Sequence, residues 1–264
     1  MKTAHDLADK AVFVTGANRG IGKAVVDCFI RNGARKVYAA ARNLKAAKHQ
    51  LGAHSGKLEL LEVDLTLPAT VAAAAQHAAD TDIVVNSAGV LSTTTSLDEH
   101  ALESLKHETE VNTFGLVRLA QAFAPVLARN GAGVFVQINS VASIKCFGHL
   151  TTYCASKAAS YAITQSLRDL WKARGIRVLS VHPGPMATDM GTTAGFAEIA
   201  EPPSVVAETI LSALGTTDFH VFPGSMAAVM GAAYASYARE IVDVDLTAEP
   251  PPAAGEHELS AATA

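Results

Sequence analysis

A tyrosine and a lysine lie four residues apart at the start of a long helical pattern, so their side chains share one face of the expected helix. A free phenol titrates at a pKa of about 10, but the Lys157 ammonium beside Tyr153 would stabilise a phenolate and lower that pKa. Such a pair can donate a proton to an oxygen atom or remove one. Ser140 ends a predicted strand, where its hydroxyl can hydrogen-bond the same oxygen. The three residues predict acid–base chemistry at a carbonyl or alcohol.

Each of these residues also has a purely structural explanation. Tyr-x-x-x-Lys recurs by chance with a packed tyrosine and a solvated lysine, and Ser140 could cap a helix or a turn. Chance matches of all three in this order are much less common, which favours the catalytic interpretation.

A glycine-rich segment links the first predicted strand to the first predicted helix. Residues 15–22 read Thr-Gly-Ala-Asn-Arg-Gly-Ile-Gly, with the spacing Gly-x-x-x-Gly-x-Gly rather than Gly-x-Gly-x-x-Gly. Glycine lets the strand turn tightly into a helix whose N-terminal amides can approach a pyrophosphate. The motif alone would also suit an ordinary tight turn. Its place in the first strand–helix unit predicts a dinucleotide-binding loop.

The choice of dinucleotide is read at the end of the second strand, where a carboxylate would bind the ribose 2′-hydroxyl of NAD and repel a 2′-phosphate. Residues 39–43 read Ala-Ala-Ala-Arg-Asn and contain no acid. Arg42 offers a planar cation to a phosphate, and Arg19 in the glycine loop can approach it from the other side. Both could be solvated surface arginines, but two cations with a missing acid predict NADP(H).

Short runs rich in β-branched residues alternate with longer segments of helical length, which is typical of a parallel sheet covered by helices. The predicted strands are 11–15, 36–40, 58–63, 82–86, 133–139, 177–182 and 219–222. Helical patterns cover 21–32, 69–79, 116–129, 152–173 and 204–214. We therefore expect one doubly wound α/β domain over 1–246, with a seven-stranded, mainly parallel sheet and helices on both faces. Residues 247–264 are rich in proline and small residues and are expected to form a disordered tail.

From about residue 10 to 222 the chain resembles a short-chain dehydrogenase/reductase, a family with a Rossmann-type fold. The resemblance rests on the glycine motif at 15–22, Asp-Leu-Thr at 64–66, Asn-Ser-Ala-Gly at 86–89, Asn112, Ser140, Tyr153 and Lys157, and Pro-Gly at 183–184. It implies that Ser140, Tyr153, Lys157 and Asn112 are catalytic, with Asn112 helping to hold a water in a proton relay.

The resemblance also implies a cofactor site in which Asp64 meets the adenine, Lys157 binds the nicotinamide ribose and Thr188 caps the nicotinamide carboxamide. Residues 86–89 would support the centre of the sheet and line the cofactor. With the glycine loop and the arginines, the expected cofactor-binding residues are Gly16, Asn18, Arg19, Gly20, Ile21, Gly22, Arg42, Asp64, Leu65, Asn86, Ala88, Gly89, Tyr153, Lys157, Pro183, Gly184, Met186 and Thr188.

The substrate should lie beyond the carboxyl ends of the strands, between the segments that follow strands four, five and six. Those segments supply mostly apolar side chains, which suit a hydrophobic ketone, aldehyde or secondary alcohol. The expected wall residues are Leu91, Val141, Ile144, Phe147, Leu150, Met190 and Phe196. Residues 186–201 hold glycines and small residues, as a lid would, although an ordinary surface loop would look similar.

Bulk composition narrows the classes of partner. The chain has 264 residues, 49% of them hydrophobic, and a net charge of -4. These values fit a globular domain and give no basic field for nucleic acid. Without a signal-peptide pattern or a long uninterrupted apolar stretch, we expect a cytoplasmic protein with no membrane partner. Three cysteines match neither a disulfide framework nor a metal site. Small and apolar helix faces favour a homo-oligomer, a dimer or a tetramer.

Three functions are compatible with parts of this sequence. The first is an NADP(H)-dependent oxidoreductase for a small carbonyl or alcohol substrate, acting mainly as a reductase. The second is an NADPH-binding regulator or scaffold without turnover, which would not need a proton relay. The third is a sugar-nucleotide epimerase or dehydratase, but too little chain follows residue 185 to hold a nucleotide sugar.

Overall fold

The computed structural model describes residues 7–52, 56–131 and 133–244, so the tail expected at 247–264 lies outside the described residues. A seven-stranded sheet forms the centre, in the order β3-β2-β1-β4-β5-β6-β7, and every pairing is parallel. This confirms the predicted doubly wound α/β fold. The strands are β1 (Ala11–Thr15), β2 (Lys36–Ala41), β3 (Leu58–Glu62), β4 (Ile83–Asn86), β5 (Val134–Ile138), β6 (Arg177–Val181) and β7 (His220–Val221).

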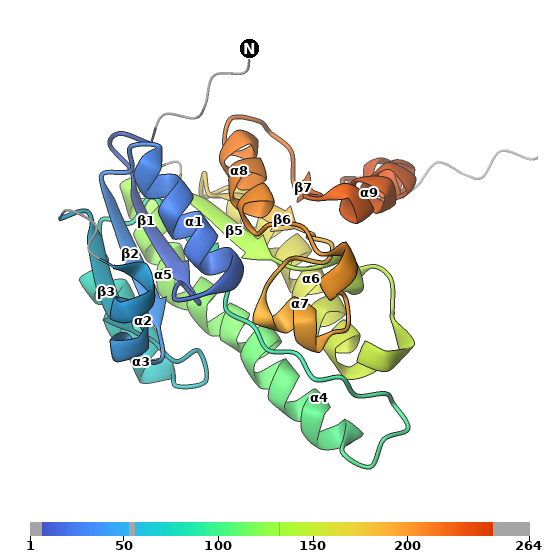
Figure 1. Ribbon diagram of the computed structural model, residues 1–264. Helices are drawn as coiled ribbons and strands as arrows, with labels where there is room; N and C mark the ends of the chain where they lie inside the picture. Colours follow the sequence, from blue (N-terminus) through green and yellow to red (C-terminus); the bar gives the residue numbers. More distant parts are fainter. Residues whose placement is uncertain (1–6, 53–55, 132, 245–264) are drawn as a thin grey trace, which may run out of the picture.

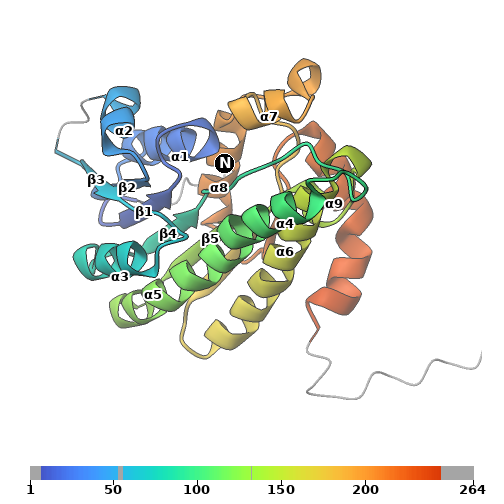
Figure 2. The same ribbon diagram turned by 90° about the horizontal axis from the view of Figure 1, so that it is seen from below.

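Helices cover both faces of this sheet (Figure 1 and Figure 2). One face is covered by α1 (Gly20–Arg31), α2 (Leu44–Leu51) and α8 (Ser204–Ala213), and the other by α3 (Pro68–His77), α5 (Gly115–Asn130) and α6 (Thr151–Lys172). Side chains of a strand alternate between the faces, so Val12 and Val14 pack in one core and Phe13 packs in the other. Because both faces are covered, all five residues of β1 are buried.

The long helical run over 101–130 extends well beyond the helix that the sequence predicts. The helix expected at 116–129 is continued towards the N-terminus by a π-helical turn, η1 (Glu110–Phe114), and by α4 (Ala101–Thr109). Figure 2 shows α4 and α5 in line beside α6. By length and composition this run could cross a membrane, but most of its apolar window is buried inside the fold, as in a core helix.

Two further helices frame the open end of the sheet. A short helix, α7 (Asp189–Thr193), lies in the expected lid, and α9 (Ser225–Tyr237) follows β7 at the sheet edge. Strand order reverses between β1 and β4, and ligands of open α/β sheets bind in the crevice at such a point. The chain therefore brings the glycine loop, which follows β1, beside the segments that follow β4 and β5.

Candidate active site

A cavity of about 800 Å³ lies at the carboxyl ends of the strands. Nearly all of the sequence-predicted site residues line it, and the structure thereby brings together segments from residue 15 to residue 226. The predicted residues found in its wall are Gly16, Asn18, Arg19, Gly20, Ile21, Arg42, Asp64, Leu65, Ala88, Gly89, Leu91, Ser140, Val141, Phe147, Leu150, Tyr153, Lys157, Pro183, Gly184, Met186, Thr188, Met190 and Phe196. Gly22, Asn86, Asn112 and Ile144 lie outside this lining.

The glycine loop is fixed against the end of β4 by one hydroxyl. Thr15 Oγ1 donates to Asn86 Oδ1 at 2.7 Å and accepts from the amides of Ser87 and Ala88, both at 3.0 Å. Gly16 has a φ of +62°, and a Cβ there would lie 3.0 Å from the Ala88 Cα. Asn86 therefore supports the centre of the sheet with its side chain, as expected, without facing the cavity.

Gly22 lets the first turn of α1 approach the loop. A Cβ on Gly22 would lie 2.2 Å from the carbonyl oxygen of Gly16. We expect Gly22→Ala to force the helix away from the loop, with a loss of roughly 1–3 kcal/mol in unfolding free energy and severe weakening of dinucleotide binding. Urea unfolding and a dinucleotide titration check this. Gly215→Ala is the matched control, because its nearest contact would be an ordinary 3.5 Å; equal behaviour of the two variants would contradict the prediction.

An anion, Asp64, and a cation, Arg42, line the part of the cavity that follows β2 and β3. The pKa of Asp64 lies below its ordinary value. Burial alone would raise this pKa, but hydrogen bonds from the Thr66 amide (2.9 Å) and hydroxyl (2.7 Å), together with the Arg42 charge, outweigh burial. Asp64 is therefore ionised at neutral pH. Ala41, Arg42 and Asn43 line the cavity after β2, so the position where an acid would select NAD carries a cation.

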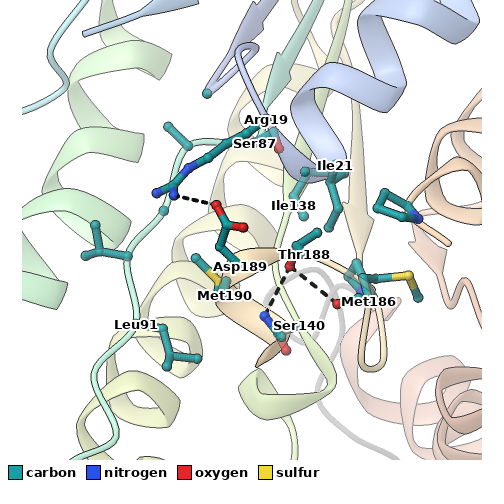
Figure 3. Close-up of a pocket in the computed structure, with 18 of the residues that line it drawn as sticks. Arg19, Ile21, Ser87, Leu91, Ile138, Ser140, Met186, Thr188, Asp189 and Met190 are labelled. Atoms are coloured by element: carbon teal, nitrogen blue, oxygen red, sulfur yellow. Dashed lines mark hydrogen bonds and ion pairs between the residues drawn. The ribbon is translucent and has the colours of Figure 1, made fainter. Parts of the chain in front are cut away.

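Arg19 forms an ion pair that the sequence did not predict. Its Nη1 lies 3.0 Å from Asp189 Oδ2, which joins the N-terminus of α1 to the first residue of α7 (Figure 3). The two side chains are 63% and 79% exposed, so the pair adds little to stability. An exposed acid after Thr188 gave no sequence signal, since only the fold brings α7 to the glycine loop.

The predicted acid–base residues meet at the end of β5. The neighbouring Ser140 hydroxyl lowers the pKa of Tyr153, but burial outweighs this effect and raises that pKa above its ordinary value. The phenol is therefore protonated at neutral pH. Lys157 Nζ donates to the carbonyl oxygen of Ile138 at 2.9 Å and lies 5.9 Å from the centre of the Tyr153 ring. The expectation that Lys157 lowers the pKa of Tyr153 stays a prediction.

Burial lowers the pKa of Lys157 from 10.5 to about 8. Below pH 8 both the folded and the unfolded chain carry the charge, so the destabilising effect of burying it is constant. Between about pH 8 and 10.5 only the unfolded chain keeps the proton, so this effect fades as pH rises. We expect the stability of the wild type to gain up to about 3 kcal/mol over that window relative to Lys157→Met. Urea unfolding at several pH values checks this; a pH-independent difference would contradict it.

Asn112 is engaged by the backbone rather than exposed to the cavity. Its Oδ1 accepts from the Val90 amide, and its Nδ2 donates to the Val90 carbonyl and to Ser156 Oγ, all at 2.9 Å. Its own carbonyl accepts from Ser160 Oγ at 2.8 Å. In this structure Asn112 ties the segment after β4 to α6, and its expected contact with a relay water stays a prediction.

The opposite wall of the cavity is apolar. The rings of Phe147 and Phe196 meet edge to face, 5.9 Å apart, and Leu150 packs in the same buried cluster. Ile144, expected in this wall, instead packs against the core beneath α5 and α6, because the short turn Val141–Ser143 sends it to the far side. Met226 of α9 also lines the cavity. The sequence did not predict it because α9 has no clear apolar stripe.

Fold and site together define a dinucleotide-dependent oxidoreductase of the doubly wound α/β class. Residues 10–198 match the family model described as short chain dehydrogenase, so the chain belongs to the short-chain dehydrogenase/reductase family. A solved short chain dehydrogenase from Burkholderia cenocepacia, in complex with NADP, is 30% identical with a TM-score of 0.81, over 89% of this chain and 96% of that chain.

Two further relatives show the spread of the family. Short chain dehydrogenase pigC of Monascus ruber is 30% identical over 224 residues, 78% of this chain and 74% of the relative. A 7α-hydroxysteroid dehydrogenase, solved with NADH and 7-oxo glycochenodeoxycholic acid, is 25% identical with a TM-score of 0.73, over 81% of this chain and 92% of that chain. Relatives of this fold thus occur with NADP and with NADH.

Proposed function

We propose that this protein reduces a hydrophobic ketone or aldehyde with NADPH and that Tyr153 donates the proton. The observation that carries the proposal is the pair of neighbouring residues Ser140 and Tyr153, in a cavity that also contains the apolar wall of Phe147 and Leu150. A carbonyl oxygen placed at these two hydroxyls would leave the rest of its molecule against that wall.

The residues present fit an NADP(H) molecule. The close approaches at Gly16 and Gly22 form a cradle that a Cβ would fill, and Arg42 stands where a 2′-phosphate needs a cation. When bound, NADPH supplies the hydride that reduces the carbonyl carbon. Tyr153, kept protonated by burial, donates its proton to the carbonyl oxygen, and Ser140 holds that oxygen by a hydrogen bond. Lys157, anchored on the Ile138 carbonyl, places a positive charge beneath the reacting groups.

Support for NADPH over NADH comes from three features. Residues 39–43 contain no acid, Arg19 and Arg42 both line the cavity, and a solved relative holds NADP. Arg19, which pairs with the exposed Asp189 in this structure, would be available to bind the 2′-phosphate together with Arg42.

Residues 186–201 are the proposed lid. A parallel bridge between Met186 and Glu201 joins the two ends of the segment, and the Ala187 amide donates to the Glu201 carbonyl at 2.8 Å. With its base joined in this way, the part that contains α7 could move over the cavity as a unit.

The proposal includes a homo-oligomer in a reducing compartment, and exposed apolar residues and free thiols support it. Leu102, Phe114 and Leu170 are large exposed apolar residues on α4, η1 and α6, which supports a homo-oligomer. Cys28, Cys146 and Cys154 are all free, which supports a reducing, cytoplasmic location.

The test is NADPH oxidation across ketones and aldehydes of graded size, with NADH in parallel. Turnover with NADPH well above NADH, best for bulky apolar carbonyls, is the expected result. Tight NADPH binding without turnover on any carbonyl would overturn the proposal and favour an NADPH-binding regulator.

A further inference from the structure

A row of polar side chains runs along the helix formed by α4 and η1, at every fourth residue. Every fourth residue of a helix shares one face, and every second residue of an extended segment points the same way. The row meets alternate residues of segment 90–94, which follows β4. The pairs are Asn112 with the Val90 amide and carbonyl (2.9 Å each), Glu108 Oε1 with the Ser92 amide (2.6 Å) and Ser104 Oγ with Thr94 Oγ1 (3.1 Å).

The same row contacts α6 on its other side. The Asn112 side chain donates to Ser156 Oγ, and the Asn112 backbone carbonyl accepts from Ser160 Oγ. Glu108 lies against the Thr152 hydroxyl. These α6 residues are again four apart, so they form one face of that helix. Tyr153 directly follows Thr152, and Lys157 directly follows Ser156. The row therefore connects the wall segment that carries Leu91 with the helix that carries the proposed acid.

Glu108 is the ionisable member of this row, and it is fully buried. Its Oε1 is satisfied by Ser92, but within the part of the chain that the structure describes, its Oε2 and Thr152 Oγ1 are both buried without a hydrogen-bond partner of normal geometry. Burial raises the pKa of the Glu108 carboxyl. A buried acid with an unsatisfied oxygen is costly, and a valine or leucine would fill the space without that cost. Packing alone does not explain this residue.

We propose that Glu108 is a positioning residue whose carboxyl group bridges the Ser92 amide and the Thr152 hydroxyl and so sets the distance between the pocket wall and Tyr153. One oxygen already holds the wall segment. The other faces the hydroxyl at the first turn of α6, one residue before the proposed acid. The carboxyl group thus spans two elements that must enclose a substrate from opposite sides.

If Glu108 positions the pocket wall against Tyr153, two substitutions of Glu108 should differ in their effect on kcat. Glu108→Gln keeps an acceptor for Ser92 and a polar group for Thr152, so kcat per NADPH-binding site should stay within about threefold of wild type. Glu108→Leu removes both contacts, so kcat should fall roughly 10- to 100-fold while the Kd for NADPH stays unchanged. Ser104→Ala is the control, because it removes the row member farthest along the helix from Tyr153 and should leave kcat unchanged.

The pH profile separates positioning from simple support of the fold. The Glu108 charge raises the pKa of Tyr153. Glu108→Gln should therefore move the alkaline limb of kcat for carbonyl reduction to lower pH. The other titratable groups beside this pair are His107 next to Glu108, and Cys154 and Lys157 next to Tyr153, and the substitution leaves them in place.

This inference rests on the proposed function for its kinetic readout, so amide hydrogen exchange supplies an independent one. Glu108→Leu should speed exchange in peptides covering 90–95 and 150–157, and Glu108→Gln should not. Faster exchange with no turnover in the wild type would sink the proposed function alone. Unchanged exchange, or equal kcat and pH profiles for wild type, Glu108→Gln and Glu108→Leu, would overturn the role of Glu108.

Discussion

Tyr153→Phe should lower kcat by roughly 10²- to 10⁴-fold and leave the affinity for NADPH almost unchanged. The phenol is the proposed proton donor, it lies in the cavity with Ser140, and burial keeps it protonated at neutral pH. The ring itself stays in the variant, so the packing of the first turn of α6 is kept. Single-turnover NADPH oxidation and a fluorescence titration of NADPH give the two quantities separately.

Tyr161→Phe is the matched control for that experiment. Tyr161 lies on the same helix, but its hydroxyl bonds to His220 Nε2 at 2.6 Å and to the Tyr234 hydroxyl at 3.1 Å, away from the cavity. The Tyr161→Phe variant should lose some stability and keep the wild-type kcat per NADPH-binding site. A Tyr153→Phe enzyme that retains most of its activity would show that the proton comes from another group.

Arg42→Asp should change the preferred cofactor. In the proposed binding mode the substitution removes a charge-assisted hydrogen bond to the 2′-phosphate, worth roughly 1.5–3 kcal/mol, and adds a like charge that costs several kcal/mol more. The new carboxylate can accept a hydrogen bond from the ribose hydroxyl of NADH. The ratio of kcat/KM for NADPH to that for NADH should therefore fall by roughly 10²- to 10⁴-fold. Initial rates with both cofactors at fixed ionic strength measure it.

Arg174→Asp controls for net charge, because Arg174 is exposed at the end of α6 and changes the total by the same amount. It should leave the cofactor ratio as it is in the wild type. If Arg42→Asp also leaves the ratio unchanged, Arg42 is a surface arginine and the preference arises elsewhere.

The features that the sequence predicted well are those that depend on local pattern. Parallel strands buried on both faces give short apolar runs, so all seven strands were found, and the glycine spacing located the turn from β1 into α1. β5 and β7 are each two residues shorter than predicted, and β7 keeps only His220 and Val221. Most of the predicted site residues share one cavity, since the ends of neighbouring parallel strands must meet at one edge.

The features that the sequence could not predict depend on side-chain partners from distant elements. Burial is the largest influence on the pKa of Tyr153, and it depends on how distant elements pack around the ring. Likewise, the partner of Arg19 comes from α7. Glu108 gave no signal either, since an acid in a charged helix usually faces solvent. Such contacts follow from the packed structure and not from spacing along the chain.

The π-helical turn at 110–114 makes the length of this helix a constraint in its own right. A π turn holds one more residue than an α-helical turn and is often found at functional sites. Deleting one residue there would let an α-helical turn replace the π turn, so α4 would keep nearly the same facing relative to α5. A deletion between Ser104 and Glu108 has no such extra residue to absorb it and would rotate the start of α4 by about 100°, which turns Ser104 away from segment 90–94. Deletions should therefore be tolerated better in the π turn than in α4, although Leu102 of α4 is exposed to solvent.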